Sequence, residues 1–348
     1  MSETLSETLS ETLGETVQER LLAVRDLKVY FPVRVSGLLR GRYQLLKAVD
    51  GVSFDLYKGE TLGVVGESGC GKSTLGRALL QLIPPTAGQV VWLGQDIAGL
   101  NSNAMRAYRK DMQIVFQDPL ASLNPRMTIG DIIAEPLRTH KPELRPAEVK
   151  QAVQAIMDHV GLLPQMINRY PHEFSGGQCQ RIGIARAMIL QPKLIVCDEP
   201  VSALDVSIQA QIVNLLMQLQ REFGLALIFI SHDLSVVRHI SQRILVLYLG
   251  RIMEIAERDA LYKRPRHPYT QALIAAVPLP DPDLERNKHR VALVGDLPSP
   301  LNPPSGCVFR SRCPWVEARC AQAIPVLEAV EDNHQVACHY WREHAGES

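Results

Sequence analysis

The stretch "GVVGESGCGKST", residues 63–74, constrains the fold of this chain more than any other feature. Gly66, Gly71, Lys72 and Ser73 fit the spacing G-x-x-x-x-G-K-[ST]. An apolar, strand-like run "TLGVV" leads into the stretch, and a helical run "LGRALLQLI" follows it. Glycines in such a loop let successive backbone N–H groups turn toward one anion, at the positive end of the helix dipole. The sequence therefore predicts an α/β fold with a phosphate-binding loop between a strand and a helix.

This loop predicts a nucleotide triphosphate with its metal ion, here ATP with Mg²⁺. Lys72 is expected to reach the β- and γ-phosphates, and the Ser73 hydroxyl is expected to bind Mg²⁺. The predicted nucleotide-binding residues of the loop are Gly66, Glu67, Ser68, Gly69, Cys70, Gly71, Lys72, Ser73 and Thr74.

A second motif, "LIVCDEP", places two carboxylates directly after an apolar run of strand type. Ligands of open α/β sheets bind at the carboxyl ends of the strands, so both side chains are expected at the nucleotide site. Asp198 is predicted to hold Mg²⁺, in part through water. Glu199 is predicted to orient and deprotonate the water that attacks the γ-phosphate. The alternative, an acidic loop after a strand, is disfavoured by the phosphate loop in the same chain.

Composition narrows the class of protein. The 348 residues contain 37 Lys plus Arg and 37 Asp plus Glu, so the formal net charge is zero, whereas a nucleic-acid binder usually carries a basic excess. No apolar run is long enough to predict a membrane span. The first 20 residues repeat Ser-Glu-Thr-Leu, lack the features of a secretory signal, and are predicted to be a disordered low-complexity segment.

The order of strand-like and helical runs divides the rest of the chain. Residues 21–256 alternate the two types, which predicts a largely parallel sheet with packed helices. Within this domain a helical subdomain is expected at about 118–185. From 257 to 348 prolines are frequent, so a loop-rich C-terminal extension is predicted.

The stretch "FSGGQCQRIGIARAMIL" supplies a second helix start suited to anions, at Ser175, Gly176, Gly177 and Gln178. One ATP cannot readily use both helix starts of a single subunit. Here the chain resembles the ABC ATPase superfamily, whose signature is L-S-G-G-Q. The resemblance implies a mixed sheet with a RecA-like core and a helical subdomain. It also implies a head-to-tail dimer, in which these four residues contact the ATP held by the partner.

The same resemblance assigns the remaining motifs. Gln117, in "QIVFQDP", matches the glutamine that senses the γ-phosphate, contributes to the Mg²⁺ site and faces the membrane subunits. Asp205, in "SALD", is expected at the dimer seam, and His232, in "IFISHD", matches the histidine that contacts the γ-phosphate. An aromatic residue near the first strand usually stacks on adenine; Phe31 is the better match and Tyr30 is the alternative.

Several phrases resemble the ATP-binding subunits of bacterial oligopeptide/dipeptide importers, in particular the F-type ATPase: "FQDPLASLNPRMTI", "EPVSALDVSIQAQIVNLL", "SHDLSVVRHI", "RHPYTQAL" and "LPSPLNPPSGCVFRSRC". This resemblance implies peptide import powered at the cytoplasmic face of the bacterial inner membrane. The implied partners are a paralogous ATPase, two transmembrane permease subunits and a periplasmic or lipid-anchored peptide-binding protein, with no nucleic acid. Three alternatives stay open: a non-peptide substrate such as glutathione or a metal chelate, a soluble ABC ATPase outside transport, and a regulatory subunit that binds ATP without hydrolysing it.

Four cysteines lie close together in the extension: Cys307, Cys313, Cys320 and Cys338. Their spacing, C-x5-C-x6-C-x17-C, matches neither the usual structural zinc pairs nor the ferredoxin pattern. Four thiols satisfy a 4Fe–4S cluster or a tetrahedral zinc, and buried free thiols are a third interpretation. The resemblance to peptide-importer ATPases implies the 4Fe–4S cluster. The scattered cysteines of the nucleotide motifs are interpreted as packing thiols.

Overall fold

The computed structural model of the chain describes residues 19–35, 42–278, 286 and 295–344. Of the predicted low-complexity segment, residues 1–18 lie outside the described residues, and Arg20 already begins the first strand. Among the described residues, the search for a helix with the length and apolar character of a membrane span finds none.

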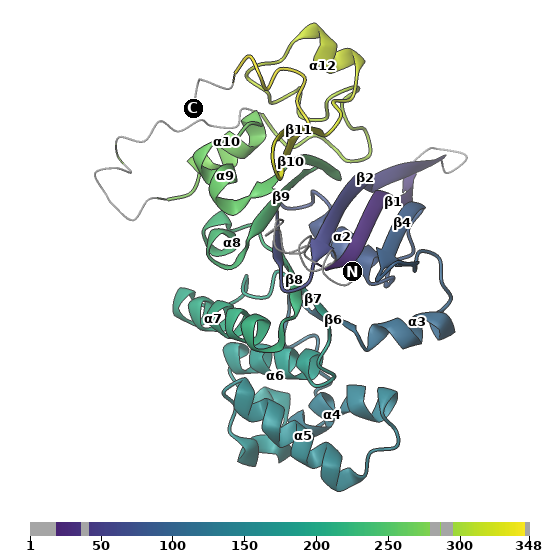
Figure 1. Ribbon diagram of the computed structural model, residues 1–348, viewed down its shortest axis with the longest axis vertical. Coiled ribbons are helices and arrows are strands. Elements are labelled where there is room, and N and C mark those ends of the chain that lie inside the picture. The colour runs from purple at the N-terminus through teal and green to yellow at the C-terminus, as the bar shows by residue number, and fades with distance from the viewer. Residues whose placement is uncertain (1–18, 36–41, 279–285, 287–294, 345–348) are drawn as a thin grey trace, which may run out of the picture.

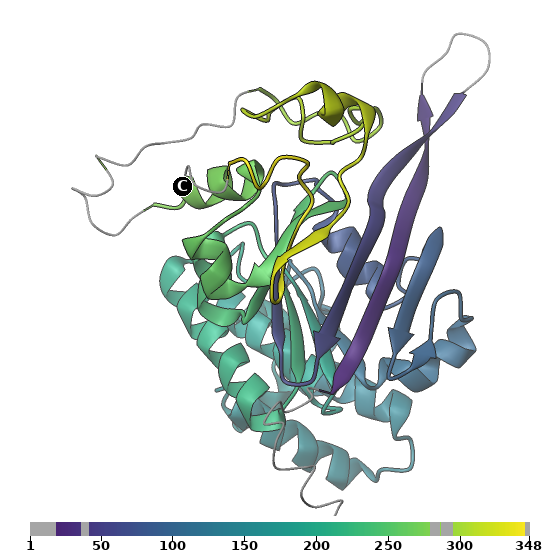
Figure 2. The same ribbon diagram turned by 45° about the horizontal axis from the view of Figure 1, so that its top comes forward.

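A four-stranded antiparallel sheet forms one layer, with the strand order β2-β1-β4-β5. Its strands are β1 (Arg20–Val35), β2 (Arg42–Tyr57), β4 (Ala87–Trp92) and β5 (Gln95–Asp96). Strands β1 and β2 are long and pair with each other along their whole length. Figure 2 shows this sheet lying beside the second, larger sheet.

The larger sheet has eight strands in the order β11-β12-β10-β9-β3-β8-β7-β6. Its strands are β3 (Thr61–Val65), β6 (Met112–Val115), β7 (Leu194–Asp198), β8 (Ala226–Ile230), β9 (Arg243–Tyr248), β10 (Arg251–Glu257), β11 (Glu328–Glu331) and β12 (His334–Val336). The five strands β9, β3, β8, β7 and β6 are parallel, and β10, β12 and β11 join them antiparallel. Every residue of β3, β7 and β8 is buried, as expected for parallel strands covered on both faces.

Helices cover this sheet, and a group of helices lies beyond it at one end of the molecule (Figure 1). The helices are α2 (Lys72–Leu79), α3 (Ser102–Arg109), α4 (Ile129–His140), α5 (Pro146–His159), α6 (Gly176–Met188), α7 (Val206–Phe223), α8 (Leu234–Ile240), α9 (Arg258–Lys263), α10 (Pro268–Ala275) and α12 (Ala318–Gln322). Two short 3₁₀ helices, Pro164–Asn168 and Pro171–Glu173, precede α6. Helix α2 contacts strands of both sheets, whereas α4, α5 and α6 gather at the opposite end of the molecule from the extension (Figure 1).

The C-terminal extension is bound into the domain that precedes it. Strand β12 pairs with β10 through Glu254–Val336 and Ile255–Gln335, so the extension lengthens the main sheet. Val308 and Phe309, which are 6% and 0% exposed, belong to the same hydrophobic core as the strands and the helical subdomain. The extension is loop-rich, as predicted from its prolines, and its stability depends on this shared core.

Candidate functional site

The phosphate loop runs from the end of β3 to the start of α2, as the sequence predicts. Two of its glycines have conformations that a side chain would disturb, with φ of 153° at Gly66 and 106° at Gly71. A Cβ at Gly66 would lie 2.1 Å from the carbonyl oxygen of Leu247, and one at Gly71 would lie 2.0 Å from that of Ala48. Only glycine fits here, because the backbone of neighbouring segments occupies the space of a side chain.

Lys72 is folded back over its own loop. Its Nζ donates to the carbonyl oxygens of Gly66 at 2.8 Å and Glu67 at 3.0 Å, and the residue is 4% exposed. The ammonium group therefore already lies inside the curve of the loop, where the loop carbonyls balance its charge. A bound phosphate would give the same ammonium an anionic partner.

Ser73 and Asp198 face each other from α2 and the end of β7. The Ser73 hydroxyl donates to Oδ1 of Asp198 at 2.6 Å, and Arg77 lies 3.3 Å from the other carboxylate oxygen. Asp198 is 1% exposed, so its carboxylate contacts these two side chains rather than bulk water. Hydroxyl and carboxylate oxygens are ligands that Mg²⁺ prefers, so this pair fits the metal that accompanies ATP. Arg77 is an addition to the predicted site, and its position one helical turn after Ser73 could have indicated it.

Glu199, the residue after Asp198, has an unusual backbone conformation. Its φ of 47° lies in the left-handed region, which non-glycine residues rarely adopt and which occurs often at functional sites. Its carboxylate accepts a hydrogen bond from Nε2 of Gln117 at 3.1 Å and lies 3.4 Å from Nδ1 of His232. The structure thus brings together the three residues predicted to be catalytic, which follow the carboxyl ends of the neighbouring parallel strands β6, β7 and β8.

A cavity of about 660 Å³ joins these groups. Its lining consists of Phe31, Leu46, Lys47, Ala48, Ser68, Gly69, Cys70, Gly71, Lys72, Ser73, Thr74, Gln117, Glu199, His232, Leu249, Gly250 and Pro300. Phe31 lies on it, whereas the neighbouring Tyr30 donates its hydroxyl hydrogen bond to Asp50 on another cavity. Successive residues of a strand point to opposite faces, so only one of the two aromatic rings can reach this cavity. Pro300 was not predicted, because nothing local links the extension to the phosphate loop.

The predicted signature residues lie elsewhere. Ser175 caps α6: its hydroxyl accepts from the backbone N–H of Gln178 at 3.4 Å, and the side-chain Oε1 of Gln178 accepts from the backbone N–H of Ser175 at 3.0 Å. Asp205 is exposed at the start of α7. The described residues that line the nucleotide cavity include neither residues 175–178 nor Asp205. A single chain therefore does not bring its two phosphate-type helix starts together.

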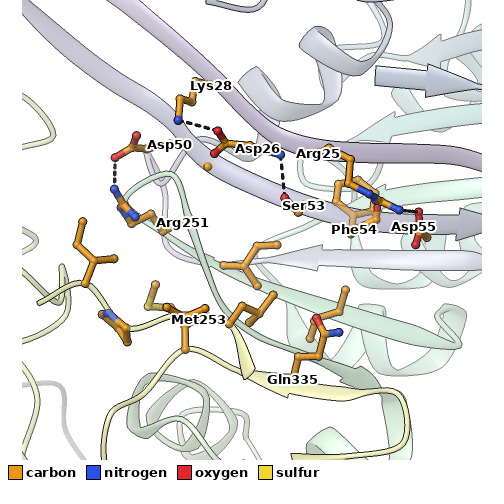
Figure 3. Close-up of a pocket in the computed structure, with 18 of the residues that line it drawn as sticks. Arg25, Asp26, Lys28, Asp50, Ser53, Phe54, Asp55, Arg251, Met253 and Gln335 are labelled. Atoms are coloured by element: carbon orange, nitrogen blue, oxygen red, sulfur yellow. Dashed lines mark hydrogen bonds and ion pairs between the residues drawn. The ribbon is translucent and has the colours of Figure 1, made fainter. Parts of the chain in front are cut away.

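A larger cavity of about 840 Å³ lies between the four-stranded sheet and the extension (Figure 3). Three ion pairs lie among its polar side chains. Arg25 binds Asp55 at 2.6 Å, Lys28 binds Asp26 at 2.8 Å, and Arg251 binds Asp50 at 2.5 Å. The opposite wall includes Met253 and Gln335. The Arg251–Asp50 pair connects β10 of the larger sheet to β2 of the smaller one, whereas the other two pairs lie within the smaller sheet. The lining of this cavity contains none of the predicted catalytic residues.

The four cysteines of the extension are close in space. The backbone N–H of Cys307 donates to the carbonyl oxygen of Cys320 at 2.8 Å. Burial, together with the neighbouring thiols, raises the pKa of the Cys313 thiol to about 12 and that of Cys338 to about 11. Within the part of the chain that the structure describes, no three His, Cys, Asp or Glu side chains form a group placed to hold a single metal ion. The other cysteines, Cys70, Cys179 and Cys197, are all buried.

Comparison with known proteins connects the two parts of the chain to two family models. Residues 49–202 match the family described as ABC transporter, and residues 253–320 match the one described as oligopeptide/dipeptide transporter, C-terminal region. The oligopeptide transport ATP-binding protein OppF of Salmonella typhimurium is 63% identical over 91% of this chain and 95% of its own length. The oligopeptide transport ATP-binding protein AppF of Bacillus subtilis is 55% identical over 93% of this chain and 98% of its own length.

A solved structure shares the fold. The ATP-binding cassette MJ0796, in a dimeric post-hydrolysis state bound to ADP and phosphate, superposes with a TM-score of 0.61 at 26% identity. The match covers 68% of this chain and 99% of that one. The predicted fold class, a mixed α/β sheet of the ABC type with a helical subdomain, is confirmed.

Proposed function

Because the chain belongs to the ABC transporter family and carries the C-terminal region of oligopeptide/dipeptide transporters, we propose that it is the ATP-hydrolysing subunit of a peptide importer. The observation that carries this proposal is the convergence of two sets of residues on one cavity. The phosphate loop lines this cavity, and so do Gln117, Glu199 and His232. This arrangement brings a phosphate-binding surface and a candidate general base to the same ligand.

Binding of the triphosphate depends on Lys72 and the loop. Lys72 exchanges its two loop carbonyls for the β- and γ-phosphates, and the backbone N–H groups of the loop donate to the same anion. Ser73 and Asp198 would hold Mg²⁺, which supplies positive charge against the phosphates when bound. Phe31, which lines the same cavity, offers its ring to the adenine.

Hydrolysis depends on Glu199. Its carboxylate orients the attacking water and accepts a proton from it, while the Gln117 amide fixes one carboxylate oxygen at 3.1 Å. The His232 imidazole, 3.4 Å from the same carboxylate, donates a hydrogen bond to the γ-phosphate oxygen as negative charge develops there. Glu199 combines the left-handed backbone with a place in the lining of the cavity.

A second ATPase subunit completes the site. Residues 175–178 and Asp205 lie away from the cavity of their own chain, so we assign them to the ATP held by a paralogous partner in a head-to-tail dimer. The pair of ATPases would bind two transmembrane permease subunits at the cytoplasmic face of the bacterial inner membrane. A periplasmic or lipid-anchored peptide-binding protein would deliver the peptide to the permease subunits. In this division residues 21–256 form the ATPase domain, with a helical subdomain at about 118–185, and residues 257–348 form the extension.

The four extension cysteines are proposed to hold a 4Fe–4S cluster. All four thiols interact electrostatically with one another, and each has lost much of its contact with water. A single zinc ion would need its sulfurs about 4 Å apart, because each Zn–S bond is about 2.3 Å. The described thiols are not placed to hold a single metal ion, and four cysteine thiolates are the ligand set of a 4Fe–4S cluster. Anaerobically purified protein should show iron and visible charge-transfer absorbance; colourless protein with one zinc per chain would contradict the cluster.

The Glu199→Gln variant tests the catalytic proposal in the complete transporter complex. We expect it to bind Mg-ATP and to lose turnover by about 10²–10⁴-fold, the usual contribution of a general base. Glu222→Gln is the matched control, because that exposed carboxylate pairs with His159 at the surface. Normal turnover in the Glu199 variant would exclude Glu199 as the base. Peptide uptake into vesicles that contain the same complex tests the substrate class.

A further inference from the structure

The extension makes direct contact with the phosphate loop. Arg312 lies between two of the extension cysteines, and its Nη1 donates to Oε2 of Glu67 at 2.7 Å. Glu67 is the first residue after the opening glycine of the loop. The Arg312 side chain is 7% exposed and that of Glu67 is 25% exposed. An ion pair with so little access to water is screened weakly by salt, so its geometry is more strongly held than that of a surface pair.

A second residue beyond the predicted ATPase domain, Tyr269, also contacts Glu67. The backbone N–H of Glu67 donates to the hydroxyl oxygen of Tyr269, at the start of α10, at 2.9 Å. Tyr269 is fully buried, and its ring contacts those of Tyr248 and Phe309 at centroid distances of 4.8 and 5.4 Å. The guanidinium of Arg312 lies 6.0 Å from the Tyr248 ring. Glu67 is therefore fixed at both its backbone and its side chain by a rigid aromatic cluster.

The position of Glu67 affects the group that binds phosphate. Its carbonyl oxygen accepts one of the two hydrogen bonds of Lys72. Its carboxylate adds negative charge to a loop that must accept the polyanionic triphosphate, and like charges in a half-buried site repel. Arg312 supplies the opposite charge and draws the carboxylate toward the extension.

We infer that Arg312 is a positioning residue for the phosphate loop, acting through Glu67, so that the C-terminal extension is part of the ATP-binding machinery. This inference rests on the proposed function of the loop. It assigns the extension a second role besides holding its cysteines. The extension also reaches the nucleotide cavity directly, because Pro300 lines it. The carbonyl of the neighbouring Leu301 accepts a hydrogen bond from Gln44 at 3.0 Å.

The test is a double-mutant cycle on the full-length chain, with the Kd for Mg-ATP measured by calorimetric titration. Arg312→Gln should raise this Kd by about tenfold, since a charge-assisted hydrogen bond commonly contributes that factor or more. Removing the carboxylate as well, in Arg312→Gln with Glu67→Gln, should restore the Kd to within about threefold of Glu67→Gln alone. Arg319→Gln is the matched control, because it removes an exposed arginine from the same extension and should leave the Kd unchanged.

Two results would overturn the inference: an Arg312→Gln protein that binds Mg-ATP within twofold of wild type, or a double variant as weak as Arg312→Gln. Rescue by neutralising Glu67 separates positioning from simple loss of structure. If Arg312→Gln does not fold, the double variant is compared with Glu67→Gln alone, and a tenfold difference there would overturn the inference. Lys72→Ala tests the loop itself. If Lys72→Ala binds Mg-ATP as tightly as wild type, the proposed function fails. If Lys72→Ala loses affinity for Mg-ATP while Arg312→Gln keeps it, only the role of Arg312 is overturned.

Discussion

Glu254 anchors the extension to the central sheet, and replacing it by alanine gives the sharpest stability prediction. This residue of β10 is fully buried and accepts three hydrogen bonds. They come from the backbone N–H groups of Arg266 and His267, at 2.7 and 2.9 Å, and from Nε2 of His334 at 2.7 Å. The first two donors lead into α10, and the third belongs to β12 of the extension. One carboxylate thus joins three segments.

The loss of unfolding free energy in the Glu254→Ala variant follows from the buried donors that it leaves without an acceptor. Each buried donor that loses its acceptor costs about 1–3 kcal/mol. Removal of the carboxylate also removes its own desolvation cost, which offsets part of that sum. The net loss is therefore about 3–5 kcal/mol, the range for a buried pair that loses one partner. At about 2 °C per kcal/mol, the midpoint of thermal unfolding should fall by about 6–10 °C.

Two further variants control for side-chain size and for strand position. Glu254→Gln keeps the shape but not the charge, so its loss should be intermediate, at about 1–3 kcal/mol. Glu257→Ala removes the exposed glutamate at the end of the same strand and should change stability by less than about 0.5 kcal/mol. The assay is urea unfolding of the purified chain, followed by fluorescence. A loss below 1 kcal/mol in Glu254→Ala would refute the reasoning that this carboxylate anchors the extension.

Three other predictions concern the nucleotide site and its thiols. Asp198→Asn should lower the rate of Mg-ATP hydrolysis by about 10²-fold, because it weakens the oxygen pair that Asp198 forms with Ser73; an unchanged dependence on Mg²⁺ concentration would contradict it. Gly66→Ala should abolish nucleotide binding in a titration, because its Cβ would lie 2.1 Å from the Leu247 carbonyl, and retained binding would show that the loop needs no glycine there. Burial raises the pKa of the fully buried Cys197 thiol, so mass spectrometry should find it unalkylated in native protein at pH 8; reaction at the rate of free cysteine would disprove its burial.

The phosphate loop and the carboxylates after β7 could be predicted from the sequence because their chemistry is contiguous. A loop that binds phosphate needs glycines, a lysine and a hydroxyl at fixed spacing, so the short stretch contains the whole signal. Parallel strands present their carboxyl ends at one edge, and this rule brings Gln117, Glu199 and His232 to a common site without knowledge of their exact distances.

Other features of the site depend on packing that no local pattern encodes. Phe31 and Tyr30 are adjacent aromatic residues, and only the pairing of β1 with its neighbours decides which ring reaches the nucleotide cavity. Strand β12 has three residues, too few for a periodic pattern, and it forms because β10 offers an edge. Both outcomes depend on which strands meet.

The sequence by itself determined the class of this protein and the chemistry of its phosphate site, whereas the tertiary structure decided what the extension does to that site. Arg312 and Glu67 are 245 positions apart, and neither belongs to a pattern that includes the other. Their contact exists because β12 and the aromatic cluster around Phe309 hold the extension against the end of β9. Many small packing contributions fix the position of the extension. A sequence motif contains only residues whose function requires a fixed spacing along the chain, so it does not show such a contact.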